Sequence, residues 1–176
     1  DAIISFNRTI DLDQDNENAF YLRGRCKCEL GYYKSAINDF NKAISLDQTN
    51  ADFWLQRGYC EYELENYEGA IIDLNQGIYK LGAVEANYLT LIGACKCKLG
   101  YYKKALIDLD KAINLDQYDD HAFYFRGMCK YELNKFKSAI DDFNKAISLD
   151  QTNADFWIYR GACKYELKNF KEAIKD

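Results

Sequence analysis

Residues 23–48 read RGRCKCELGYYKSAINDFNKAISLDQ, and residues 126–151 read RGMCKYELNKFKSAIDDFNKAISLDQ. The two copies lie 103 residues apart, and from Lys34 onward they differ only at Asn38, which is Asp141 in the second copy. Self-similarity on this scale indicates a repeat array. The displacement equals three repeats, so the chain grew by duplication of blocks of three. Such growth favours extension of a surface over construction of one unique pocket.

The recurring signature is an Arg-Gly-x-Cys motif with further residues at fixed offsets. Its five glycines are spaced 34, 35, 34 and 34 residues apart, at Gly24, Gly58, Gly93, Gly127 and Gly161. A cysteine, a leucine, an aromatic residue and an alanine follow each glycine; in the first copy these are Cys26, Leu30, Tyr33 and Ala36. The apolar residues form two stripes at helical spacing. Between them lies a break that offers Gly or Asn, residues that tolerate the left-handed conformation ending a helix. Each copy therefore predicts two helices.

These residues, on a 34-residue period, resemble the tetratricopeptide repeat, and the resemblance covers the whole chain. It implies an all-α, right-handed superhelical solenoid of antiparallel helix–turn–helix repeats. The chain departs from the family pattern in three ways. Gln or Gly-Ala replaces the proline that usually ends the second helix, and Lys or Glu replaces a tyrosine three residues after the glycine. The leucine before the glycine is Arg23, Arg57, Arg126 or Arg160, and only Ile92 is apolar there.

The repeat register divides the chain into six segments. Residues 1–16 match only a second helix, full repeats occupy 17–50, 51–85, 86–119 and 120–153, and 154–176 is a partial repeat. Neither end resembles the polar capping repeat that solenoids need for solubility. We therefore expect a single array that is an internal slice of a longer protein.

One junction between repeats is irregular. Residues 77–86 contain the extra residue of the 35-residue spacing, and Gly77 and Gly82 replace the Ala and Gln found elsewhere. We expect Gly82 to end its helix in a left-handed conformation, and the stacking there to differ from that at the other junctions.

Composition excludes several classes of protein. The chain has 176 residues, a net charge of −5, 48% hydrophobic residues and no proline. The charge disfavours nucleic-acid binding, which needs a surplus of Lys and Arg. No apolar run is long enough for membrane insertion, and no leader indicates secretion. The seven cysteines recur at a repeat position rather than in a disulfide-like spacing, which favours a reducing, cytoplasmic location.

The paired cysteines Cys26-x-Cys28 and Cys95-x-Cys97 suggest metal ligands or a redox pair. Residues two apart on a helix point about 200° away from each other, so one zinc ion cannot bind both. The chain also has only one histidine, His121, and structural zinc sites usually need four ligands. We therefore interpret the repeated cysteine as a small buried core residue, and expect Cys28 and Cys97 on a different, partly exposed face. We predict no metal and no cofactor.

An aspartate lies sixteen residues after the position of each recurring arginine, at Asp39, Asp73, Asp108, Asp142 and Asp176. Antiparallel helices with the turn midway would bring the two positions together. The arginine then either pairs with the aspartate or lays its stem on the core with its head in water.

The face of each first helix that points away from the second helix holds the second, fifth, ninth, twelfth and thirteenth repeat positions. The resemblance implies that this face lines the concave groove in which tetratricopeptide proteins commonly bind peptides. The predicted groove residues are Tyr21, Arg25, Glu29, Asp52, Leu55, Tyr59, Tyr62, Glu63, Lys98, His121, Tyr124, Met128, Tyr131, Glu132, Asp155, Ile158, Tyr165 and Glu166, with Asn18, Cys28, Asn87, Thr90, Ala94, Cys97 and Ala162 at the remaining positions. Tyrosine suits recognition because it combines a large contact area with a polar tip. Alternatively, the tyrosines simply fill the inner curve of the superhelix.

No catalytic motif is present: we find no phosphate-binding glycine loop, no His–Glu metal motif and no nucleophile with a paired histidine. We predict a non-enzymatic protein–protein interaction module or scaffold within a larger assembly, acting through the concave groove, the outer face or both. The alternative is a regulatory or substrate-recruiting arm of an enzyme or co-chaperone whose catalytic domain lies outside this chain.

The predicted groove places carboxylates around an aromatic floor. This arrangement favours a basic, amphipathic segment of another protein as the partner. It disfavours the acidic tails of heat-shock chaperones, which related grooves bind with Lys and Asn. We expect no nucleic acid and no small-molecule substrate.

Overall fold

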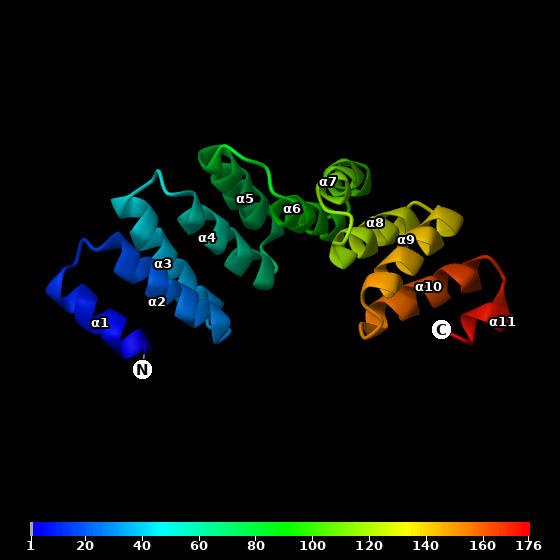
Figure 1. Ribbon diagram of the computed structural model, residues 1–176, viewed down its shortest axis with the longest axis horizontal. Coiled ribbons are helices and arrows are strands. Elements are labelled where there is room, and N and C mark those ends of the chain that lie inside the picture. The colour runs from blue at the N-terminus through cyan, green and yellow to red at the C-terminus, as the bar shows by residue number, and fades with distance from the viewer. Residues whose placement is uncertain (1) are drawn as a thin grey trace. The chain divides into compact units, whose positions relative to one another are not determined.

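The chain is all-helical in the computed structural model, which describes residues 2–176. Within that range there are eleven α-helices and no strand (Figure 1). The helices are α1 (Ala2–Leu12), α2 (Glu17–Glu29), α3 (Tyr33–Leu46), α4 (Ala51–Glu63), α5 (Tyr67–Leu81), α6 (Ala86–Lys98), α7 (Tyr102–Leu115), α8 (Asp120–Glu132), α9 (Phe136–Leu149), α10 (Ala154–Glu166) and α11 (Phe170–Ala173). The predicted all-α fold of helix–turn–helix pairs is confirmed.

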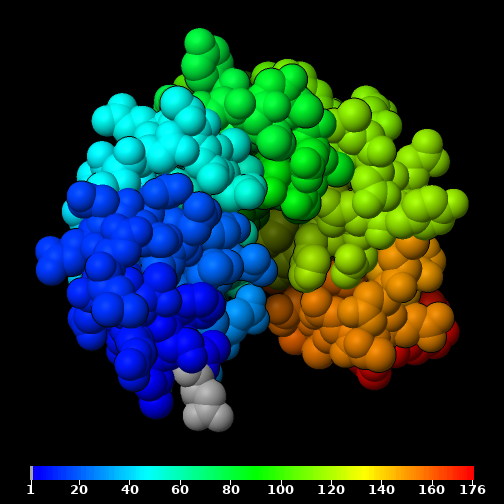
Figure 2. All heavy atoms as spheres, turned by 60° about the vertical axis from the view of Figure 1, so that its left-hand side comes forward, coloured from blue at the N-terminus to red at the C-terminus, as the bar shows by residue number. Residues whose placement is uncertain are grey.

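The chain divides into two compact units, Asp1–Val84 and Glu85–Asp176. The first unit holds α1 to α5, and the second holds α6 to α11. Within each unit, every first helix packs on the second helix of its own repeat and on the helices of the neighbouring repeat. The space-filling view shows that side chains fill the spaces that the ribbon leaves between the helices of each unit (Figure 2).

Glycine permits the close approach of the first and second helix in each repeat. A Cβ atom on Gly24 would lie 2.8 Å from the Phe40 ring, and one on Gly127 would lie 2.7 Å from the Phe143 ring. Both distances are too short for a real contact. The ring four residues after the repeat alanine therefore occupies the space of the missing side chain. This explains why glycine stands at this position despite its cost of about 1 kcal/mol in helix propensity.

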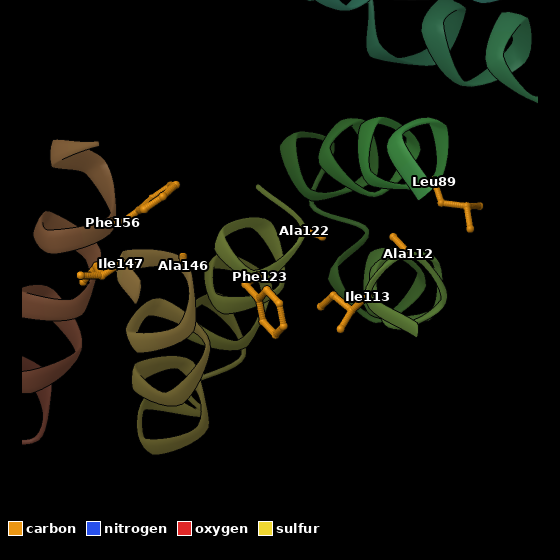
Figure 3. Packing of buried hydrophobic residues seen from close by; sticks show 8 residues of the cluster. All are labelled: Leu89, Ala112, Ile113, Ala122, Phe123, Ala146, Ile147 and Phe156. Atoms are coloured by element: carbon orange, nitrogen blue, oxygen red, sulfur yellow. The ribbon is translucent and has the colours of Figure 1, made fainter. Parts of the chain in front are cut away.

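The core runs through each unit as a layer between the helices. In the second unit it is formed by Leu89, Ala112, Ile113, Ala122, Phe123, Ala146, Ile147 and Phe156 (Figure 3). These residues come from five successive helices, α6 to α10, so the layer is continuous across the repeats. In the first unit Phe20, Ala43, Ile44 and Phe53 form the equivalent layer. Ala112, Ala122 and Ala146, which are fully buried, therefore let neighbouring helices approach each other in this layer.

The turn between the two helices of a repeat is made by one left-handed residue. Gly31, Gly100 and Asn134 take this conformation, as predicted. In the other two copies the prediction was wrong, because Glu65 and Lys168 are left-handed, with φ of 62° and 61°. The asparagine that follows Glu65 instead caps the next helix: Asn66 Oδ1 accepts a hydrogen bond from the Gly69 backbone N–H at 3.3 Å.

Gly82 ends α5 in the left-handed conformation, with φ of 71°, as predicted. It lies near the end of the first unit. Whether the stacking at this junction differs from the others stays a prediction.

Candidate functional site

Four arginines hold neighbouring helices together, and we call Arg23, Arg57, Arg126 and Arg160 the arginine ladder. Arg23 Nε and Nη2 donate hydrogen bonds to the carboxylate oxygens of Asp39 at 3.0 and 2.6 Å. The same bidentate geometry joins Arg57 to Asp73 at 2.6 Å for both bonds. Of the two alternatives that the spacing of sixteen residues left open, the ion pair is therefore the one that forms, and an arginine head in water is excluded at these positions.

Each ladder arginine also bonds to the preceding repeat, which we did not predict. Arg23 Nη1 donates to Asn7 Oδ1 at 2.8 Å, sixteen residues earlier in the chain. The equivalent acceptors of the other three arginines are Asn41, Asp110 and Asn144. The signal was present in the sequence, because Asn or Asp recurs at this offset. One guanidinium therefore joins two second helices on either side of its own.

In three repeats a lysine four residues after the arginine contacts the same carboxylate, whereas after Arg57 this position is Glu61. Lys27 Nζ lies 2.8 Å from Asp39, and Lys130 Nζ lies 2.7 Å from Asp142. Asp39 and Asp142 are only 4% and 3% exposed, so two cations compensate each buried carboxylate. In the repeat with Ile92, Lys96 alone pairs with Asp108. Where both departures from the family pattern occur in one repeat, the Arg and the Lys therefore bind the same carboxylate.

The repeated cysteines are buried, as predicted, at Cys60, Cys95, Cys129 and Cys163, while Cys26 is half-buried. The expectation for Cys28 and Cys97 was wrong, because they are only 7% and 4% exposed. The twelfth position of a first helix faces the first helix of the next repeat instead of solvent. Cys60 Sγ donates a hydrogen bond to Cys28 Sγ at 3.0 Å. That bond lowers the pKa of Cys28 and raises the pKa of Cys60.

An aromatic–carboxylate group covers this cysteine pair. Burial raises the pKa of Tyr33, and a hydrogen bond to Glu63 adds to the effect. Burial and the charge of Glu63 together raise the pKa of Tyr59 to about 12. Cys28 of α2, Tyr33 of α3, and Cys60 and Glu63 of α4 form a group that we call a closed layer. In it the carboxylate of the thirteenth position is satisfied by a tyrosine of the preceding repeat.

A second closed layer lies between α6 and α8. It consists of Cys97, Tyr102, Cys129 and Glu132, each 69 residues after its counterpart in the first layer. A hydrogen bond from Cys129 lowers the pKa of Cys97, and Tyr102 bonds to Glu132. Each unit therefore contains one such layer.

The contact between α8 and α10 is different, and we call Tyr131, Phe136, Cys163 and Glu166 the open layer. Phe136 stands where Tyr33 and Tyr102 stand, so it has no hydroxyl to donate to Glu166. A pocket of about 180 Å³ lies here, lined by Tyr131, Glu132, Asn134, Phe136 and Glu166. The Tyr131 ring packs edge-on against Phe136 at a centroid distance of 5.5 Å. Burial, followed by the charge of Glu166, raises the pKa of Tyr131.

Aromatic rings continue from the open layer along the second unit. Tyr159 contacts Tyr131 at 6.1 Å and Tyr124 at 5.7 Å between ring centroids. Tyr124 also contacts Phe125 and Phe156, at 5.1 and 5.0 Å. We did not include Phe125 and Tyr159 in the predicted groove, because they occupy the sixth repeat position. The sequence feature that could have identified them is that the sixth position is aromatic only in the last two repeats.

Two family models match the sequence. The model described as "Anaphase-promoting complex, cyclosome, subunit 3" matches residues 1–77, and the tetratricopeptide-repeat model matches residues 121–153. The chain belongs to the tetratricopeptide-repeat family. Among curated proteins, no sequence gave a significant match.

Solved structures of other tetratricopeptide proteins share the fold. YrrB, described as a TPR protein with an unusual peptide-binding site, superposes with a TM-score of 0.75 at 20% identity, over 97% of this chain and 87% of that one. MamA from Desulfovibrio magneticus RS-1 gives 0.81 at 17% identity, over 90% and 89%. The APC/C hetero-tetramer Cut9–Hcn1 gives 0.82 at 18% identity, over 99% of this chain and 35% of that one. At these identities the likeness shows the fold alone.

The predicted groove residues of the tetratricopeptide repeats fall into three groups. Those exposed to solvent are Arg25, Glu29, Asp52, Tyr59, Glu63, Lys98, His121, Glu132, Asp155, Ile158, Tyr165 and Glu166. Half-buried are Tyr21, Tyr62, Tyr124 and Tyr131, and of these Tyr21 packs on Phe40 and Phe53. The tyrosines therefore divide between the two interpretations, with some filling the inner layer and others accessible.

Leu55 and Met128 form the third group, and for them the groove prediction was wrong, as it was for Thr90 and Ala94, which are 7% and 0% exposed. Leu55 is 2% exposed because Gly77 leaves room for it: a Cβ on Gly77 would lie 2.5 Å from Leu55 Cδ2. Met128 is 8% exposed and packs with Cys97, Leu109 and other core residues. Neither side chain is accessible to a ligand.

Two further findings concern the described residues, 2–176. They contain no group of three or more His, Cys, Asp or Glu side chains placed to hold a metal ion. None of their helices is both long and apolar enough to cross a membrane.

Proposed function

We propose that this chain is a non-catalytic interaction module of a larger assembly and that it binds a basic, amphipathic segment of another protein. Its relatives support the general role. One family model describes a subunit of a complex, one solved neighbour is a hetero-tetramer, and another has a peptide-binding site. The free cysteines support a reducing, cytoplasmic location. The observation that carries the finer proposal is the pocket of the open layer.

The pocket suits one cationic side chain. Glu132 and Glu166 place two carboxylates at its wall, and Tyr131 and Phe136 supply aromatic faces. A Lys or Arg side chain would lay its stem on the rings and direct its charged head to the carboxylates. The volume of about 180 Å³ lies below the ~300–1,000 Å³ of pockets that enclose a small-molecule ligand. A side chain of a bound protein fits this site better than a free metabolite.

Aromatic rings beside the pocket offer an apolar contact. Tyr131 packs edge-on against Phe136, and its ring also contacts that of Tyr159. Asp155 of α10 adds a further negative charge. An amphipathic segment can therefore lay its apolar side on these rings while its basic residues meet the carboxylates. Acidic tails and nucleic acid are disfavoured, because they would meet like charge.

The test is a binding titration with a labelled amphipathic peptide of about 15 residues that carries lysines on its polar face, measured by fluorescence anisotropy. Glu166→Gln should weaken binding about fivefold, since it removes one carboxylate without changing shape. Asp141→Asn is the matched control, because it removes one charge on α9 and restores the residue found at position 38. We expect that control to bind as the parent chain does.

Three outcomes would contradict the proposal: equal loss with both variants, stronger binding of a peptide with Glu in place of Lys, or no binding at all. A complementary test is partner recovery from the full-length protein carrying Tyr131→Ala. Unchanged recovery, with helicity intact by circular dichroism, would move the binding site to the outer face.

A further inference from the structure

The thiols of Cys28 and Cys60 are neighbours in space although they lie on separate helices. Their sulfurs are 3.0 Å apart, and the hydrogen bond joins α2 to α4. A disulfide has an S–S bond of about 2.0 Å, so a shift of about 1 Å would bring the sulfurs to bonding distance. Packing alone does not require a thiol at this place, because the same repeat position is Tyr62 or Tyr131 in other copies.

The same arrangement recurs in the second unit. Cys97 and Cys129, 69 residues after the first pair, belong to one buried cluster, and their interaction lowers the pKa of Cys97. The four cysteines of the two pairs are all buried, with exposed fractions of 7% or less. Cys163 provides the internal contrast: it is equally buried, but its counterpart in the preceding repeat is Tyr131. The thiol pairs are therefore specific to the two closed layers.

We propose that Cys28 with Cys60, and Cys97 with Cys129, are inter-repeat dithiols that a hydroperoxide oxidises to disulfides. Each unit then acquires one covalent link between the first helices of neighbouring repeats. The inference concerns the chain's own thiols and does not depend on the proposed partner.

The chemistry balances with one hydroperoxide for each disulfide. Cys28, the more exposed sulfur and the acceptor of the hydrogen bond from Cys60, attacks the peroxide oxygen as the thiolate. The O–O bond breaks, an alcohol or water leaves with the thiol proton, and Cys28 becomes a sulfenic acid. Cys60 Sγ then attacks the sulfur of the sulfenic acid, the S–S bond forms, and water leaves with the proton of Cys60. Two thiols and one hydroperoxide thus give one disulfide, one alcohol and one water.

The test is peptide mapping of the native chain after exposure to hydrogen peroxide. Free thiols are blocked with an alkylating agent, the chain is digested with trypsin without reduction, and linked peptides are identified by mass spectrometry. Cleavage after Lys and Arg places Cys28 on residues 28–34 and Cys60 on residues 58–80. The chain used should carry Cys26→Ser. Residues 26–27 and 97–98 both read Cys-Lys, so without this change their two tryptic peptides could not be told apart by mass.

We expect two linked products, 28–34 with 58–80 and 97–98 with 127–130, and an intact mass lower by four hydrogen atoms. Cys163, on residues 161–164, should stay reduced during the peroxide treatment and should therefore be recovered in its alkylated form. Cys28→Ser should abolish only the first product and leave the second as an internal control of folding.

Several results would overturn the proposal. One is oxidation of Cys163 as fast as that of the pairs. Another is conversion of the four cysteines to sulfinic acids without any linked peptide. A third is a set of links that join cysteines at random and persists in denaturant, since this would show that the fold does not select the partners.

Discussion

The closed layer between α2 and α4 and the open layer between α8 and α10 occupy the same place in the repeat. In the closed layer Tyr33 bonds to Glu63, and the Cys28 and Cys60 thiols bond to each other. In the open layer, Phe136 and Tyr131 occupy the positions of Tyr33 and Cys28. The carboxylate there loses its tyrosine hydroxyl, and a pocket lies beside it. Two exchanges on one backbone thus distinguish a layer whose carboxylate meets a tyrosine from one that has a pocket beside its carboxylate.

The comparison separates the parts of a repeat that hold the fold from those that vary. The arginine ladder and the glycine contact recur in both units with the same geometry. The twelfth position and the first aromatic of the second helix differ between copies. Because these two positions are not the ones that form the arginine ladder and the glycine contact, they can change without loss of the stack. The following predictions test this separation, from the largest expected effect to the smallest.

Removal of an aspartate that pairs with the arginine ladder should lower stability more than any other change, and by the same amount in both units. Asp142→Ala leaves Arg126 and Lys130 partly buried without their shared anion, so we expect a loss of about 3–5 kcal/mol in the free energy of unfolding. Asp39→Ala should lower the free energy of unfolding by a similar amount. The measurement is urea denaturation followed by circular dichroism.

Asp110→Ala is the control for this prediction. Asp110 contacts the same Arg126 but its side chain is 58% exposed, so its loss should cost about 1 kcal/mol or less. Equal effects of Asp110→Ala and Asp142→Ala would show that burial does not set the strength of the ladder.

Overpacking of the contact between the two helices of a repeat should be the next largest effect. Ala139 and Ala36 are fully buried at equivalent positions, one in the repeat of the open layer and one in that of the closed layer. Replacing either with Leu should lower stability by about 1–3 kcal/mol, because the extra methyl groups find no space. The exposed neighbour Lys137→Leu should be near neutral. A neutral Ala139→Leu would contradict the repeat register.

Much of this scaffold was predictable from the sequence, because it depends on contacts within one repeat. Periodicity identified the helices, and the spacing of sixteen residues indicated the Arg–Asp pair as one of two alternatives. Contacts between repeats were harder to predict from the sequence. The burial of Cys28 depends on the angle at which the next first helix packs, which no single repeat encodes. Leu55 is buried because Gly77, on another helix, is small. A helical wheel cannot report a substitution 22 residues away.

The candidate site was predicted in outline only. Position counting placed Tyr131, Glu132 and Glu166 on one face, and the structure brings them to one pocket. The role of Phe136 was not predictable in this way. Its effect appears only through the hydroxyl that Tyr33 and Tyr102 donate to a carboxylate of the next repeat.

Phe136→Tyr should convert the open layer towards the closed type. The new hydroxyl would stand 30 residues before Glu166, the same offset as from Tyr102 to Glu132, and would donate to that carboxylate. We expect about fivefold weaker binding of the lysine-bearing peptide, near 1 kcal/mol, because the peptide must displace a hydrogen bond to a charged group. Stability should change little. Tyr102→Phe is the reverse experiment, and unchanged peptide binding in Phe136→Tyr would separate the pocket from the ligand site.

The smallest expected effect lies in the turns, where each unit holds a Glu or Lys in an unfavourable conformation. Glu65 and Lys168 have positive φ, which costs an ordinary residue roughly 1–2 kcal/mol. Glycine removes that cost but loses about 0.5–1 kcal/mol through its greater freedom in the unfolded chain. Glu65→Gly should therefore stabilise the first unit by about 0.5 kcal/mol, and Lys168→Gly should stabilise the second by a similar amount. Calorimetry should show a rise of about 1–2 °C in the unfolding midpoint.

Two controls separate backbone strain from charge in these turns. Glu65→Gln removes the charge and keeps the strain, so its midpoint should stay that of the parent chain. Gly31→Ala introduces strain at the equivalent turn of the first repeat, where φ is 75°, and should lower the midpoint. If Glu65→Gln stabilised as much as Glu65→Gly, charge repulsion rather than backbone conformation would explain the effect. The left-handed turn would then be neutral to residue type, which would account for its variation between Gly, Glu, Asn and Lys across the five copies.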